Sequence, residues 1–153
     1  MKTNGKTIEV LNDLIRINND RVEGYEKAAK ETRAEDADLR ALFHDMAVES
    51  RAYVNELNKF VFEESGEPAE GTTKRGKIYR VWMDVKTTFS GHDRKSILAA
   101  CEFGEDAAQR AYETALSSDA EMPAAIRQTI VDQQSRLKRS HDKVKQLRDK
   151  QVV

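Results

Sequence analysis

Two stretches of this sequence place a carboxylate inside an otherwise apolar helical stripe. Spacings of three and four residues keep the members of each stripe on one face of a helix. A charge that faces a core is costly unless it is paired, hydrogen-bonded or bound to metal. Glu49 and Glu105 are therefore the first candidates for a functional site. The two stripes are Leu39, Leu42, Met46, Glu49, Tyr53, Leu57, Phe60 and Leu98, Cys101, Glu105, Ala108, Tyr112, Leu116.

Apolar repeats of the same kind predict four long helices and no strands. We expect them over residues 6–32, 37–64 and 94–118, with a fourth that begins near Pro123. The short polar run at residues 33–38 forces the first two helices to be antiparallel neighbours. Asp36 is placed to cap the second helix, and Gly66 is placed for a left-handed cap at its C-terminus.

The connection between the second and third long helices is long and carries an amphipathic helix of its own near residues 75–89, with Trp82 and Phe89 on its apolar side. A helix of ~15 residues is ~22 Å long, enough to run back along a bundle. A crossover of this kind is what the ferritin-like topology needs. We therefore predict an all-α, ferritin-like four-helix bundle with a long helical crossover, forming one domain over residues 1–153. Trp82 and Phe89 anchor the crossover in this interpretation, and a partner-binding use of them is the alternative.

The charge balance points away from nucleic acid and membranes as partners. The 26 basic and 27 acidic residues nearly cancel, and no apolar run approaches the ~20 residues of a membrane span. The polar N-terminus lacks the apolar region of a signal peptide, and the single cysteine, Cys101, excludes an intrachain disulfide. We expect a cytoplasmic protein in which Cys101 is buried in the core.

Two segments and several single residues carry a resemblance to a known family. They include residues 79–86, with Trp82, and residues 101–108, with the sequence Gly-Glu-Asp at 104–106. The remaining matches are Asp20, Gly24, Tyr25, Ile97, Leu98, Tyr112, His141, Asp142, Val144 and Leu147. Together they resemble a bacterial family of ferritin-like four-helix-bundle proteins known as a domain of unknown function. The resemblance implies a ferritin-like bundle and carries no established reaction.

Counting outward from the two helical turns places several polar residues at one level of the bundle. Glu49 lies roughly opposite Asn18, and Glu105 lies near Gln133 and Gln134. A hydrogen-bonded layer with nearby tyrosines would satisfy Glu105 without a metal. The predicted layer contains Asn18, Tyr25, Tyr53, Tyr112, Gln133 and Gln134.

A metal site is the competing interpretation of the same level. Glu49, Glu105 and His141 are the candidate ligands, since di-iron carboxylate sites lie at this depth in four-helix bundles. However, such sites use Glu-x-x-His pairs, and the sequence contains none. In the alternative to a metal site, Glu49 pairs with a neighbouring arginine or lysine, and His141 is a core histidine whose hydrogen bonds are made within the protein. We expect no cofactor, with weak binding of a divalent ion as the alternative.

These observations favour a non-catalytic role in binding or assembly, with self-association into a homo-oligomer left open. The rival hypothesis is an atypical carboxylate protein that binds iron or another divalent ion, with oxidase or storage-like activity. The missing Glu-x-x-His pairs favour the first, and Glu105 in the middle of its stripe favours the second. The balance leans against an enzyme.

Overall fold

The computed structural model describes residues 2–70 and 94–150, and it has four long helices in these ranges. They are α1 (Lys2–Glu31), α2 (Ala37–Glu63), α4 (Arg94–Ser117) and α5 (Ala124–Asp149), with a short 3₁₀ helix at Ala34–Asp36. No strand occurs among the described residues. The prediction of an all-α four-helix bundle is therefore confirmed.

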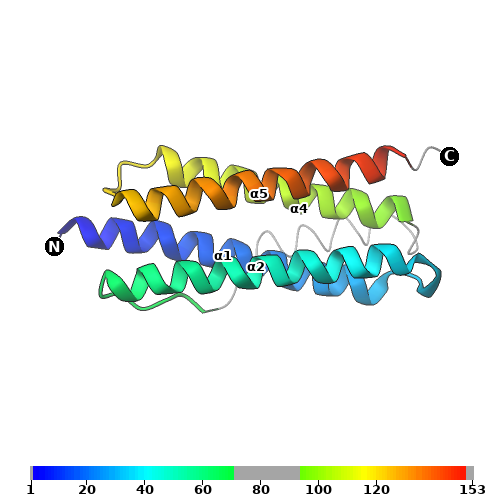
Figure 1. The fold of residues 1–153 in the computed structure, drawn as a ribbon, viewed down its shortest axis with the longest axis horizontal. Helices are drawn as coiled ribbons and strands as arrows, with labels where there is room; N and C mark the ends of the chain where they lie inside the picture. The colour runs from blue at the N-terminus through cyan, green and yellow to red at the C-terminus, as the bar shows by residue number, and fades with distance from the viewer. Residues whose placement is uncertain (1, 71–93, 151–153) are drawn as a thin grey trace.

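The helices form two antiparallel hairpins that pack side by side (Figure 1). The first hairpin is α1 with α2, the second is α4 with α5, and α1 also packs against α4. Because α2 and α4 run in the same direction, the end of α2 and the start of α4 lie at opposite ends of the bundle (Figure 1). This is the topology that the expected crossover requires. The predicted crossover helix, with Trp82 and Phe89, lies outside the described residues.

The core consists of two apolar clusters with a polar layer between them. The first cluster holds Leu11, Leu14, Ile15, Ile17, Tyr53, Leu57, Val61, Ala108, Tyr112, Ala115, Ile126, Ile130 and Leu137. The second holds Tyr25, Ala28, Ala29, Leu39, Phe43, Met46, Ala47, Ile97, Leu98, Ala100, Cys101 and Val144. On α1 the change from one cluster to the other falls at Asn18 and Arg21, both of them buried. Cys101 is buried in the core, as expected.

The ends of α2 differ in detail from the prediction. At the C-terminus Ser65 takes the left-handed conformation, with φ 66°, and Gly66 follows it. The Gly66 amide donates to the Val61 carbonyl at 2.9 Å, which closes a Schellman motif. The left-handed cap expected at Gly66 was thus wrong by one residue. The glycine serves a different need, since a Cβ there would lie 2.8 Å from Ile8 Cδ1.

Asp36 does occupy the N-cap position of α2, but its side chain makes no capping hydrogen bond. It accepts instead from Nη1 of Arg94 at 3.2 Å, and Asp38 binds the same guanidinium through Nη2 at 2.7 Å. These contacts fasten the start of α4 to the turn between α1 and α2.

Candidate functional site

The centre of the polar layer is a buried ion pair between Arg21 of α1 and Glu105 of α4. Both side chains are essentially inaccessible, at 1% and 0%. Arg21 Nη2 donates to Glu105 Oε2 at 2.8 Å, and Nε lies 3.1 Å from Oε1. This two-pronged contact is the geometry in which an arginine binds a carboxylate most strongly.

Other groups complete the shell around this pair. The Tyr25 hydroxyl donates a short hydrogen bond to Glu105 Oε2, and the Arg21 guanidinium carbon lies 5.1 Å from the centre of the Tyr25 ring. Arg21 Nη2 is also 3.1 Å from Glu49 Oε1, so a single guanidinium lies between the two predicted carboxylates. Ser140 of α5 donates to the same Glu49 oxygen at 3.1 Å. The layer thus connects all four described long helices.

Burial by itself would lower the pKa of Arg21, but the negative charge of Glu105 and the hydrogen bond between them outweigh it and raise that pKa. The pKa of Tyr25 is also raised, chiefly by burial and by the adjacent Glu105 charge. Arg21 is therefore a permanent cation in the core, and Tyr25 remains a protonated hydrogen-bond donor.

From Arg21 a chain of hydrogen bonds leads toward the first apolar cluster. Ser50 Oγ accepts from Arg21 Nη1 at 2.7 Å and donates to Asn18 Oδ1 at 2.9 Å. Asn18 Nδ2 donates to the Tyr112 hydroxyl at 2.8 Å. Each member is buried, and each donates a hydrogen bond to the next one along. The chain is therefore one continuous series of donors and acceptors.

The chain ends at the surface on α2. The Tyr112 hydroxyl donates to Gln133 Oε1 at 2.6 Å, and Gln133 Nε2 donates to Glu56 Oε1 at 2.8 Å. Tyr53 is buried nearby, and burial followed by the Glu49 charge raises its pKa. Gln134 contributes its backbone carbonyl, which accepts from Gln109 at 3.4 Å. The structure thus brings Asn18, Tyr25, Tyr112 and Gln133 into one network, and it places Gln134 at the edge.

His141 lies apart from the ionic layer, in an outer cluster with Glu102 and Asp106 of α4. Its Nε2 is 2.6 Å from Asp106 Oδ1, and its Nδ1 is 3.1 Å from Asp142 Oδ1. One ligand atom from each of Glu102, Asp106 and His141 lies within 4.8 Å of the others. Burial lowers the pKa of His141, but the bonds to Asp142 and Asp106 outweigh this and raise it. The candidate metal set of Glu49, Glu105 and His141 is therefore divided between two places.

Arg21, Ser50 and Ser140 are members of the layer that the sequence reasoning missed. The predicted layer did not include Arg21, because a charged residue does not extend an apolar stripe. A different spacing carries the signal: Leu11, Leu14, Asn18, Arg21, Tyr25 and Ala28 alternate steps of three and four, as the inner positions of a coiled coil do. The structure buries all six.

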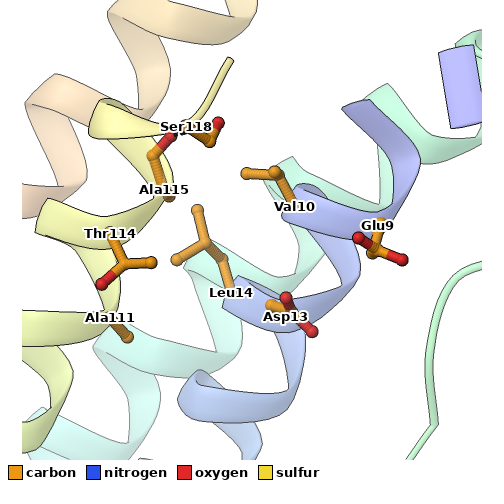
Figure 2. Close-up of a pocket in the computed structure, with 8 residues that line it drawn as sticks. All are labelled: Glu9, Val10, Asp13, Leu14, Ala111, Thr114, Ala115 and Ser118. Carbon is orange, nitrogen blue, oxygen red and sulfur yellow. Dashed lines mark hydrogen bonds between the residues drawn. The ribbon is translucent and has the colours of Figure 1, made fainter. Parts of the chain in front are cut away.

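A shallow groove lies on the outside of the bundle between α1 and α4, with a volume of about 350 Å³ (Figure 2). Its lining residues are Glu9, Val10, Asp13, Leu14, Ala111, Thr114, Ala115 and Ser118. The wall from α4 consists of short side chains, and the wall from α1 adds Val10 and Leu14 together with two carboxylates (Figure 2). The groove is therefore apolar at its base and acidic along one side.

Comparison with known proteins adds one assignment. Residues 6–118 match the family described as Domain of unknown function (DUF2383). No curated protein matches the chain. None of the helices in the described ranges combines the length and the apolar character that crossing a membrane requires.

Proposed function

The chain belongs to the DUF2383 family, and we propose that it is a ferritin-like bundle with a non-catalytic role in binding or assembly, whose polar layer holds the helices in register. In this proposal the interior is structural and the outer surface makes the contacts with partners.

The observation that supports the proposal is the position of Arg21 between two carboxylates. Its guanidinium lies 2.8 Å from Glu105 and 3.1 Å from Glu49, where a metal-binding bundle would place its ion. The side chain thus supplies the positive charge that the buried carboxylate needs. A buried polar group with specific partners also disfavours other alignments of the helices, which is a known use of such groups.

The rival proposal keeps an ion on Glu49 and Glu105, with oxidase or storage-like activity. It would require both carboxylates to release Arg21 and Glu105 to release Tyr25. It would also leave a guanidinium in the core without its buried partner, at a cost of several kcal/mol. We therefore rank it second.

We place the binding surface in the groove of Figure 2 and assign it a basic amphipathic helix from a partner protein. Apolar side chains of such a helix would fill the base formed by Val10, Leu14 and the alanines of α4. Lysine or arginine side chains would meet Glu9, which is exposed, and Asp13, which also contacts Arg16 at 3.1 Å. Helix-in-groove recognition uses this combination of apolar anchors and rim charges.

The test uses a fluorescent helical peptide of leucine and lysine and measures anisotropy. Ala111→Trp should fill the groove and raise the Kd at least about tenfold, and Glu9→Lys should raise it about threefold or more in low salt. The matched control is Ala125→Trp, an exposed alanine of α5, which should leave the Kd within about twofold. Equal binding by Ala111→Trp and Ala125→Trp would reject the groove. Sedimentation that shows a dimer dispersed by Ala111→Trp would instead identify a second copy as the occupant.

A further inference from the structure

The outer cluster on α4 and α5 contains the parts of a divalent-metal site that the proposed function does not use. Glu102 and Asp106 lie one helical turn apart on α4, and His141 faces them from α5. They offer two carboxylates and one imidazole, a donor set that suits Zn²⁺, Fe²⁺, Co²⁺ or Mn²⁺. We infer that Glu102, Asp106 and His141 bind one divalent transition-metal ion at the surface of the bundle.

The imidazole is already held in the orientation that a metal ligand needs. Asp142 contacts Nδ1 at 3.1 Å, which leaves Nε2 directed toward Asp106. Histidines that bind metals commonly have their other ring nitrogen held by a carboxylate in this manner, because the bond fixes the ring and increases its basicity. Asp142 lies outside the set of three ligands, so it provides support for the site without occupying a coordination position.

The present geometry is close to a binding geometry, and a small movement separates the two. His141 Nε2 and Asp106 Oδ1 are 2.6 Å apart, whereas two ligands at about 2.1 Å from a tetrahedral ion are about 3.4 Å apart. Opening that contact by less than about 1 Å makes room for the ion. The Asp106 side chain is 48% exposed, so the movement needs no change in the core. Water would complete the coordination shell.

Arg148 is the competitor for this site. Its Nη1 forms a short ion pair with Glu102 Oε1, so a positive charge already occupies part of the space near the ligands. An ion must displace this contact and the proton shared between His141 and Asp106. Affinity is therefore moderate at neutral pH. It should rise when Arg148 is removed, because Glu102 is then available to the metal ion.

The experiment titrates the full chain with Co²⁺ and Zn²⁺, with calorimetry for stoichiometry and the visible Co²⁺ bands for coordination. We expect one ion per chain, and a Kd raised about tenfold or more by His141→Gln and by Asp106→Asn. Arg148→Gln should lower the Kd several-fold. The control is His44→Gln, which removes an exposed histidine of α2 and should leave the Kd unchanged. Circular dichroism of each variant verifies that the fold persists.

Binding that survives His141→Gln, or that is lost equally in His44→Gln, would overturn the inference. So would an Arg148→Gln variant that binds no more tightly than the parent protein. Loss of the ion in Glu49→Gln with retention in His141→Gln would reject this site and move the metal to the ionic layer. The inference does not depend on the proposed binding role, since the peptide assay at the groove reports on that role separately.

Discussion

Glu105 and Asp106 are neighbours in sequence, yet they belong to two very different carboxylate sites. Glu105 points into the core, where an arginine and a tyrosine bind it and water has no access. Asp106 points outward to His141, with its side chain 48% exposed. The buried site has a fixed cation supplied by the chain, whereas the cation at the outer site is a titratable imidazole. Burial therefore decides which of two adjacent acids is structural and which is free to exchange its partner.

The largest effect should come from removing the cation of the buried site. Arg21→Met leaves Glu105 in the core without its ion-pair partner, which should lower the free energy of unfolding by about 3–5 kcal/mol. Urea denaturation measures it. In the combined variant Arg21→Met, Tyr25→Phe, Glu105→Leu, apolar groups replace the whole set, and most of the loss should be recovered. If Arg21→Met alone is as stable as the parent protein, the ion pair is not the centre of the layer.

A direct comparison of the two neighbouring acids gives the next largest difference. Glu105→Gln removes a charge that Arg21 and Tyr25 both contact, and we expect a loss of about 1–3 kcal/mol in unfolding free energy. Asp106→Asn weakens a partly exposed contact, and the loss should stay below about 1 kcal/mol. Thermal and urea unfolding of both variants provide the measurement. Equal losses would mean that burial does not separate the two sites.

A smaller effect concerns the exposed pair that joins Asp38 and Arg94. The hydrogen bond from Arg94 lowers the pKa of Asp38 from 3.8 to about 2. A carboxyl whose pKa falls on folding stabilises the protein above its unfolded pKa and loses that contribution as the pH falls through the folded value. The parent protein should thus melt slightly above Asp38→Asn at about pH 5, and the gap should close toward about pH 2. A constant gap across this range would contradict the assignment.

The smallest expected response is the uptake of iron by the buried layer. Since Arg21 already binds both carboxylates, anaerobic titration with Fe²⁺ followed by air should produce no oxo-bridged pair of irons. Absorption spectroscopy and iron analysis of the protein after gel filtration measure it. Two irons per chain, with a charge-transfer band lost in Glu49→Ala and Glu105→Ala, would make the oxidase or storage proposal the leading one.

The helices could be predicted from the sequence because their apolar repeats are local. The second helix was expected over residues 37–64 and is found at Ala37–Glu63, and the third was expected over 94–118 and is found at Arg94–Ser117. The Gly66 error has a physical cause. Glycine usually takes the left-handed position because it lacks a Cβ. Here Ser65 takes the left-handed position, and the residue after it, Gly66, has to lack a Cβ because it packs against Ile8 of another helix.

The site could be predicted only in part, because its central contact is not local. The sequence identified Glu105 as an acid that needs a partner, and it predicted Asn18, Tyr112 and Gln133 at the same level. It could not identify Arg21, because arginine is seldom buried and its partner lies on another helix. The outer cluster was missed because its members also lie on different helices. Glu102 and Asp106 precede His141 by more than 30 residues along the chain.

The separation of Arg21 and Glu105 by 84 residues also has a consequence for the order of folding. Each helical hairpin can form from contacts between consecutive helices, whereas the ion pair can form only when α1 of one hairpin meets α4 of the other. Closing a loop of that length costs chain entropy before the contact can offset it, so we predict that this ion pair forms late, after the rate-limiting barrier. Interactions that are absent from the transition state act on the unfolding rate. Loss of Arg21 should accordingly leave the folding rate nearly unchanged and raise the unfolding rate, which shortens the lifetime of the folded bundle.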